Sequence, residues 1–278
     1  MSLKLFALDL DGTLLSPDKQ ISQEDVEAIQ EIQRDGHIVM VCSGRAPEDI
    51  KAILSKYNLT CPIAGSNGTV VEADNHIISQ ISMEQNDVIS IIQRLNEMVF
   101  PYCLYTNNGI YFPDDWSERV KQSIKGLGNT DFHRFIERPQ ISVHVNVFTD
   151  HTKLLLDKHI KVNKLYILTF GPDRRNKLVP FLNDYSNIAV TSSSSINVEI
   201  MHKGGHKAVG LKRMAEYYNI PLENTVAIGD NLNDIPMLEC AGYSIAMDNA
   251  DKEVKKICDF VTLSNSESGI SHALKQFR

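Results

Sequence analysis

The sequence predicts an α/β fold in which a doubly wound, mostly parallel, Rossmann-like sheet is interrupted by an inserted α+β domain. At both ends of the chain, continuous apolar runs alternate with segments of helical periodicity, which is the pattern of a parallel sheet covered by helices. Between these ends the order changes to paired strands with lone strands and helices. We therefore expect a core from residues 1–83 and 202–278 and a second domain over residues 84–201.

The N-terminal part of the core begins with an apolar run at residues 3–10, which predicts a buried strand. Ser22 is suited to cap the helix that follows, and Asp35-Gly36 is a typical helix end. The next expected elements are a strand at 37–43, a helix opened by Pro47, a short strand at 62–64, and a type I′ hairpin turn at Asn67-Gly68.

The C-terminal part repeats the alternation of strand and helix, so both parts are expected to share one sheet. Its expected elements are a helix at 206–218, a strand at 225–230, a helix at 233–240, a strand at 243–247, a short helix and a strand at 260–263. Ligands of such sheets bind beyond the carboxyl ends of the strands. Asp9, Ser43 and Asp230 all stand at that edge.

The inserted segment reads as two strand pairs separated by lone strands and helices. We expect a helix at 86–98, two strands within 102–112, a helix, a strand at 141–148, a helix, a strand at 164–170, a helix, and strands at 188–192 and 196–201. The serine run at 191–196 fits a flexible linker or a hairpin turn, and we favour the hairpin.

Composition limits the function classes. The 278 residues carry a formal net charge of -7, which argues against a broad basic surface for nucleic acid polymers or acidic membranes. No apolar run approaches the roughly 20 residues that cross a bilayer, and no signal peptide is evident. The five cysteines include no CxxC pair, which indicates reduced thiols. We expect a cytoplasmic protein.

Four carboxylates carry the first chemical signal. Asp9 and Asp11 flank a single leucine at a strand end, and Asp230 and Asp234 stand four residues apart at another. Converging on one edge of the sheet, they would raise each other's pKa unless a cation neutralised them. Mg²⁺ prefers such oxygen ligands, so the sequence predicts a magnesium site.

A second group of residues suits a phosphate. Ser43 and Gly44 offer a hydroxyl and backbone N–H groups, and Lys207 is expected at a helix N-terminus. One carboxylate of the Asp9/Asp11 pair can then attack phosphorus, while the other protonates the departing oxygen and later activates water. Arg45 is interpreted as a loop-fixing residue outside the catalytic set.

These motifs resemble those of the haloacid dehalogenase-like (HAD) phosphatases. They are DLDGT at 9–13, SGR at 43–45, Lys207 ahead of a helix, and GDNLND at 229–234. The stretch 199–250 is similar to the Cof-type subfamily, which carries a large α/β cap between the second and third motifs. The inserted segment has the order of that cap, αββ(αβαβ)αββ, so the resemblance spans nearly the whole chain.

The resemblance implies a role for each motif residue. Asp9 would be the nucleophile and a Mg²⁺ ligand, Asp11 the general acid/base and a ligand through its main-chain carbonyl, and Asp230 the third ligand. Asp234 would support these ligands without touching the ion. The phosphate would be held by the Leu10 amide, Ser43, Gly44, Lys207 and Asn233. Because Ala208 replaces a usual glycine, Lys203 stays an alternative to Lys207.

The function expected from the residues and the resemblance is a Mg²⁺-dependent phosphatase that forms an aspartyl-phosphate on Asp9. Its partner would be a small phosphorylated metabolite, namely a sugar phosphate, a nucleotide or a phosphorylated cofactor. Two alternatives stay open. One is a sugar phosphomutase, and the other is a catalytically silent module that binds metal and phosphate for regulation.

Overall fold

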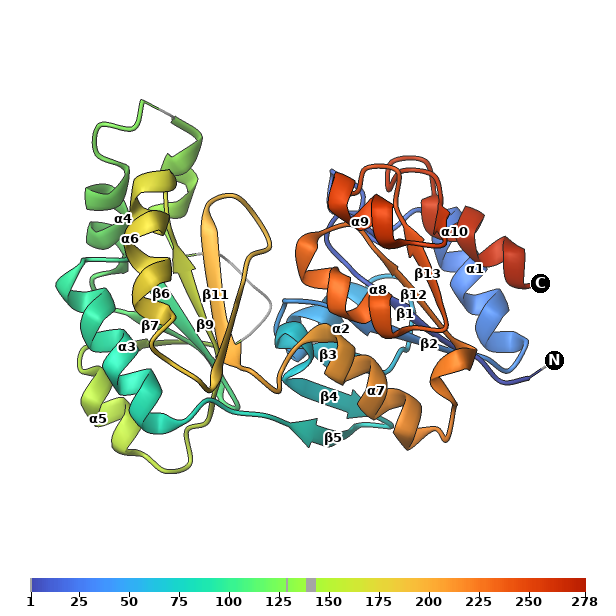
Figure 1. Cartoon of the computed structure of the whole chain (residues 1–278), viewed down its shortest axis with the longest axis horizontal. Helices are drawn as coiled ribbons and strands as arrows, with labels where there is room; N and C mark the ends of the chain where they lie inside the picture. Colours follow the sequence, from blue (N-terminus) through green and yellow to red (C-terminus); the bar gives the residue numbers. More distant parts are fainter. Residues whose placement is uncertain (1, 129, 139–143) are drawn as a thin grey trace. The chain divides into compact units, whose positions relative to one another are not determined.

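The computed structural model describes residues 2–128, 130–138 and 144–278. The chain forms two compact units, one from Met1–Gln80 with Gly205–Arg278 and one from Ile81–Gly204 (Figure 1). We call them the core unit and the insert unit. The boundaries predicted from the sequence lie at 83–84 and 201–202, whereas the units of the structure meet at 80–81 and 204–205.

The core unit is built on a sheet with the strand order β14-β13-β12-β1-β2-β3-β4-β5. Its strands are β1 (Leu5–Leu8), β2 (Ile38–Cys42), β3 (Ile63–Gly65), β4 (Val70–Ala73), β5 (His76–Gln80), β12 (Thr225–Gly229), β13 (Tyr243–Ala246) and β14 (Phe260–Val261). The strands from β14 to β3 run parallel, and β4 and β5 run antiparallel to their neighbours. Leu5 pairs with both Ile38 and Thr225, so the two ends of the chain share one sheet, as predicted.

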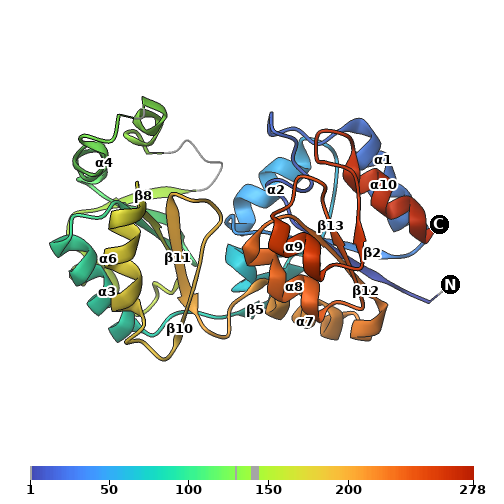
Figure 2. The same cartoon turned by 45° about the horizontal axis from the view of Figure 1, so that its top comes forward.

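Helices cover both faces of this sheet (Figures 1 and 2). They are α1 (Gln23–Arg34), α2 (Pro47–Ser55), α7 (Lys207–Tyr217), α8 (Ile235–Cys240), α9 (Lys252–Ile257) and α10 (Gly269–Leu274). Apolar residues of α1, α2 and α10 form one core cluster, and those of α7, α8 and α9 form another. Each buried Leu or Ile side chain contributes about 1.5–3 kcal/mol to folding. These clusters hold the strand ends that carry the acidic motifs.

The ends of α1 follow from local chemistry. The Ser22 hydroxyl accepts a hydrogen bond from the Asp25 N–H at 3.1 Å and caps the first turn. Asp35 caps the C-terminus, and Gly36 follows with a φ of 86°, a left-handed conformation that suits glycine. Both predicted helix ends are confirmed.

The predicted turn at Asn67-Gly68 is partly wrong. β3 and β4 do form a hairpin, but Gly65 pairs with Val70, so the loop is longer than the two residues of a type I′ turn. Asn67 has a φ of 61° and Gly68 a φ of 85°, as the sequence signal suggested. In this longer loop, the Asn67 side chain accepts a hydrogen bond from Asn233.

The insert unit contains a sheet with the strand order β10-β11-β9-β6-β7-β8. Its elements are α3 (Gln85–Glu97), β6 (Tyr102–Thr106), β7 (Gly109–Pro113), α4 (Trp116–Ile124), β8 (Val145–Phe148), α5 (His151–Leu156), β9 (Val162–Leu168), α6 (Pro172–Leu182), β10 (Ile188–Thr191) and β11 (Asn197–His202). This order matches the predicted αββ(αβαβ)αββ arrangement. Residues 141–143 of the strand predicted at 141–148 lie outside the described residues. Thr191 pairs with Glu199 across the serine run, so the predicted hairpin is confirmed.

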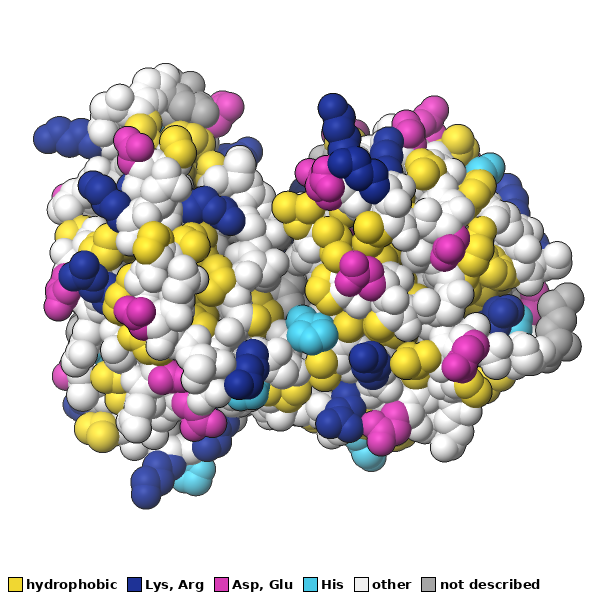
Figure 3. All heavy atoms as spheres, viewed as in Figure 1, with side chains coloured by type: hydrophobic (Ala, Val, Ile, Leu, Met, Phe, Trp, Pro, Cys, Tyr) yellow, Lys and Arg dark blue, Asp and Glu magenta, His cyan; other side chains and the backbone are white. Residues whose placement is uncertain are grey.

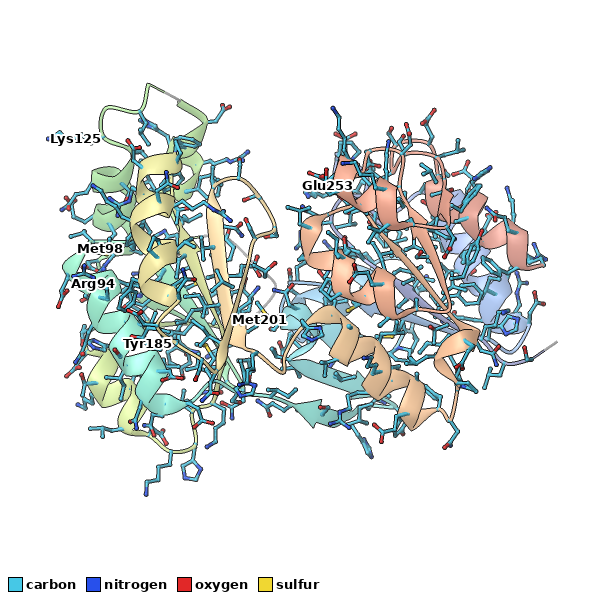
Figure 4. The ribbon with its side chains drawn as sticks, in the orientation of Figure 1. Arg94, Met98, Lys125, Tyr185, Met201 and Glu253 are labelled. Atoms are coloured by element: carbon cyan, nitrogen blue, oxygen red, sulfur yellow. The ribbon has the colours of Figure 1, made fainter. Side chains whose placement is uncertain are left out.

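The helices α3 and α6 pack side by side on the insert sheet. The hydroxyl oxygens of Ser90 and Tyr185 lie 2.7 Å apart, and the Arg94 guanidinium lies 5.9 Å from the centre of the Phe181 ring. Figure 4 labels Arg94 and Tyr185 on this side of the unit and Met201 on β11. An apolar cluster that includes Ile91 and Leu178 joins these helices to the strands.

The visible surface of each unit carries acidic and basic side chains in mixture, and neither sign forms a broad patch (Figure 3). Among the helices of the described ranges, none combines the length and the apolar character needed to cross a bilayer.

Candidate active site

Asp9 directly follows β1 and lies inside the protein. Its N–H donates a hydrogen bond to the Ile228 carbonyl on β12 at 2.9 Å, and the residue is 4% exposed. The Lys207 ammonium lies 2.5 Å from its Oδ1. Burial raises the pKa of Asp9 well above its usual range, Asp234 adds to this rise, and Lys207 opposes it. A further cation next to Asp9 would favour its ionised form.

Lys207 is the first residue of α7, and its side chain is buried. Its Nζ also lies 2.5 Å from Asp234 Oδ1. Burial lowers the pKa of the ammonium, but the charges of Asp234 and Asp9 outweigh burial and raise it overall. Lys207 thus stays charged. Lys203 belongs to the insert unit and donates a hydrogen bond to the Ser186 carbonyl at 3.1 Å.

Asp234 is fully engaged by protein groups. Its Oδ2 accepts hydrogen bonds from the N–H groups of Asp230 at 3.0 Å and Asn231 at 2.9 Å, while its Oδ1 faces Lys207. Asp230 follows β12, and its Oδ1 accepts a hydrogen bond from the Thr13 hydroxyl at 2.8 Å. Burial, and then the charge of Asp234, raises the pKa of Asp230 to about 6. Asp234 is thus held by two main-chain N–H groups and an ammonium, and Asp230 by the Thr13 hydroxyl.

These carboxylates suit a small divalent cation. One oxygen each of Asp9, Asp230 and Asp234 lie within 4.8 Å of one another. Lys207 contacts Oδ1 of Asp9, and Thr13 contacts Oδ1 of Asp230, so each carboxylate also has its Oδ2 atom. Gly12 leaves the space next to them, since a Cβ at its φ of +90° would collide with the Asp230 carboxylate. This donor set of hard oxygens fits Mg²⁺.

Asp11 does not belong to the close group that Asp9, Asp230 and Asp234 form, and its carboxylate contacts basic side chains instead. Arg45 Nε and Nη2 lie 2.6 and 2.9 Å from its two oxygens, and Lys19 Nζ lies 2.9 Å from Oδ1. Burial raises the pKa of Asp11, but the hydrogen bonds and charges of Arg45 and then Lys19 lower it overall, to about 2. β1 ends at Leu8, so the alternation of an extended strand does not extend to Asp11. Its charge is neutralised by side chains.

The other predicted phosphate ligands line the neighbouring strand ends. Ser43 follows β2 and is buried, and its Oγ accepts a hydrogen bond from the Arg45 N–H at 3.3 Å. Leu10 separates the two acids, and Gly44 follows Ser43. Asn233 Nδ2 donates a hydrogen bond to Asn67 Oδ1 at 3.3 Å. The Ser43 carbonyl in turn accepts from the Asn67 N–H at 2.9 Å.

Sequence reasoning left three residues of this region outside the site. Arg45 and Lys19 hold Asp11, and Asn67 connects Ser43 with Asn233. The signal for Arg45 was its place directly after Ser43-Gly44. Asn67 carried only a turn signal, and the lysine stands in an ordinary polar turn.

The chain is similar to known proteins over nearly its whole length. The profile of the haloacid dehalogenase-like hydrolases matches residues 6–274. The chain belongs to this family. Phosphatase YwpJ of Bacillus subtilis (strain 168) is 30% identical over 284 residues, which cover 98% of this chain and 99% of YwpJ. The 5-amino-6-(5-phospho-D-ribitylamino)uracil phosphatase YwtE of the same organism is 30% identical, with 99% and 98% covered.

The fold of this HAD chain also matches solved structures. A haloacid dehalogenase-like hydrolase from B. subtilis superimposes with a TM-score of 0.87 at 28% identity, covering 99% of this chain and 100% of the other. The HAD phosphatase BT1666 from Bacteroides thetaiotaomicron gives a TM-score of 0.79 at 26% identity, with 99% and 95% covered. The predicted fold, family and enzyme class are confirmed: the chain is a phosphoric monoester hydrolase.

Proposed function

We propose that this HAD phosphatase is Mg²⁺-dependent and hydrolyses small phosphomonoesters through an aspartyl-phosphate on Asp9. The observation that carries the proposal is the position of Lys207, which bridges Asp9 and Asp234 beside Asp230. A buried ammonium between carboxylates can bind a phosphoryl oxygen as well as orient the nucleophile. An ion pair with a purely structural role would not need a third carboxylate, Asp230, beside it.

Asp9 and Asp230 would hold the Mg²⁺, together with the main-chain carbonyl of Asp11. When bound, the ion supplies charge neutralisation for the acids and for the phosphoryl group. Asp234 keeps Asp230 and the N-terminus of α7 in place through the contacts described above. The Leu10 amide, Ser43, Gly44 and Asn233 would complete the phosphate site.

The reaction would proceed in two steps. An Asp9 oxygen forms a bond to phosphorus as the bond to the leaving oxygen breaks, and Asp11 gives that oxygen a proton. Asp11, now a carboxylate, then takes a proton from water, which attacks phosphorus and frees both Asp9 and inorganic phosphate. Asp11 must therefore enter the first step protonated, although Arg45 and Lys19 favour its charged form here.

The substrate class follows from the relatives. YwtE is named for a phosphorylated ribitylaminouracil, which combines a sugar-like chain with a heterocycle. We infer that the substrate of this chain is likewise a sugar phosphate or a phosphorylated cofactor or cofactor precursor. The negative formal charge of the chain agrees with a small ligand captured by local groups.

A phosphate-release screen tests the proposal. Ribose 5-phosphate, glucose 6-phosphate, flavin mononucleotide and p-nitrophenyl phosphate would be incubated with the protein and either Mg²⁺ or a chelator. We expect multiple turnovers with Mg²⁺ only. Conversion of a sugar phosphate into its isomer without phosphate release would favour the phosphomutase, and binding without turnover would favour the silent module.

A further inference from the structure

The Asp11 side chain is only partly buried. Its exposed fraction is 38%, compared with 6% for the Asp9 side chain. A partly buried aspartate can still rotate about two bonds, so hydrogen bonds help to select its direction. Arg45 contacts both carboxylate oxygens, at 2.6 and 2.9 Å. Such a two-pronged contact fixes the carboxylate plane as well as its position.

Arg45 is itself anchored to a rigid element. Its Nη1 lies 2.7 Å from Asp49 Oδ2, and the Asp49 side chain is 9% exposed. Asp49 stands in the first turn of α2, where the helix dipole favours a negative charge. The backbone of Arg45 is also held, because its carbonyl accepts a hydrogen bond from the Ser66 N–H at 2.7 Å. Contacts therefore run from α2 through Asp49 and Arg45 to Asp11.

We propose that Arg45, anchored by Asp49, is a positioning residue that directs the Asp11 carboxyl group toward the leaving oxygen. The inference rests on the proposed function and assigns a task to a residue that the motif analysis left aside. In the first step, the proton moves from Asp11 to the leaving oxygen, and Arg45 neither gains nor loses one. Afterwards Arg45 holds the Asp11 carboxylate for the attack of water.

Lys19 contacts the same carboxylate but restrains it less than Arg45 does. Its side chain is 60% exposed, and its ammonium makes a single contact with Asp11 at 2.9 Å. A flexible, solvated lysine restricts direction less than an anchored guanidinium does. Lys19 therefore offers a comparison variant that removes a cation from Asp11 without removing the two-pronged contact.

The test compares two leaving groups by kcat/KM, which covers only the steps up to departure of the leaving group. The p-nitrophenolate group leaves readily without a proton, whereas the alkoxide of the best-hydrolysed sugar phosphate in the screen needs one. Because a general acid contributes roughly 10²–10⁴-fold, we expect Arg45→Gln to lower kcat/KM for the sugar phosphate by about 10–100-fold. For p-nitrophenyl phosphate, we expect a loss of less than about 3-fold.

Further variants separate direction from charge and from folding. Arg45→Lys keeps the charge but not the two-pronged contact, so it should show the same selective loss. Asp49→Asn should show a smaller selective loss, and Lys19→Gln the smallest. Arg34→Gln, on the exposed face of α1, should match the unchanged protein. Activity on p-nitrophenyl phosphate reports that each variant is folded.

Equal losses with both substrates, or no loss with either, would overturn the inference, and so would full recovery by Arg45→Lys. An unchanged protein that hydrolyses neither substrate would instead overturn the proposed function, and this inference with it. The wild-type control therefore distinguishes the two failures.

Discussion

The ammonium of Lys207 lies 2.5 Å from Asp234, and both side chains are at most 1% exposed. A buried ion pair contributes little net stability, but removal of one partner leaves an uncompensated charge in the protein interior. Asp234 also accepts two main-chain hydrogen bonds at the end of β12. The pair therefore links the structure of this region to its chemistry.

Replacement of Asp234 should destabilise the fold. We expect Asp234→Ala to lower the free energy of unfolding by about 3–5 kcal/mol, because Lys207 loses a charge partner and two N–H groups lose their acceptor. Urea unfolding followed by circular dichroism measures this loss. Asp248→Ala is the control, since the Asp248 side chain is 63% exposed in its pair with Lys255 and removal should cost about 0–1 kcal/mol. Equal losses for the two variants would contradict the structural role of Asp234.

Replacement of Asp9 should remove activity and leave the fold intact. Asp9→Asn keeps the shape of the side chain but removes the nucleophilic oxygen, so we expect turnover to fall by about 10⁴-fold or more. Phosphate release and circular dichroism measure the two properties. Mass spectrometry of acid-quenched wild-type protein should find a phosphorylated peptide that contains Asp9. A variant with normal turnover would exclude Asp9 as the nucleophile.

Much of this region could be predicted because strand ends are local features. The apolar runs before Asp9, Ser43 and Asp230 determine where the strands end, and parallel strands bring those ends to one edge. Lys207 could be placed because a helix begins there. The position of each of these side chains follows largely from the element that carries it.

The direction of Asp11 could not be predicted in the same way. It depends on a contact with Arg45, which is distant in sequence. The Asp11 side chain is also only partly buried, so several of its rotamers are locally possible. The loop at Asn67 is similar, because its length depends on how β3 and β4 pair. In both cases a tertiary contact decides between local conformations that the sequence allows equally.

The stabilisation by Mg²⁺ should depend on pH. In the metal-free chain the pKa of Asp230 is raised to about 6, so between about pH 4 and pH 6 the folded chain binds more protons at this residue than the unfolded chain does. The contribution of Asp230 to stability therefore falls as pH rises through that window. Mg²⁺ requires the ionised carboxylate, so the gain in Tm on adding MgCl₂ should be larger at pH 7.5 than at pH 5.

Thermal denaturation with and without MgCl₂ at both pH values tests this dependence. Asp230→Asn serves as the matched variant, and we expect it to lose most of the gain at pH 7.5. Equal gains at the two pH values in the unchanged protein would show that the ion binds elsewhere.

Gly12 should be required for the acidic site itself. Its φ of +90° disfavours any other residue, and a Cβ would also collide with the Asp230 carboxylate. Gly36 is a matched control, since its φ is +86° but a Cβ there would meet nothing within 4 Å. We expect both Gly→Ala variants to lose about 1 kcal/mol or more of stability through backbone strain. Only Gly12→Ala should also lose phosphatase activity and the increase in Tm with Mg²⁺, because only there must Asp230 move. If Gly36→Ala lost activity to the same extent, backbone strain and not the position of Asp230 would explain the effect.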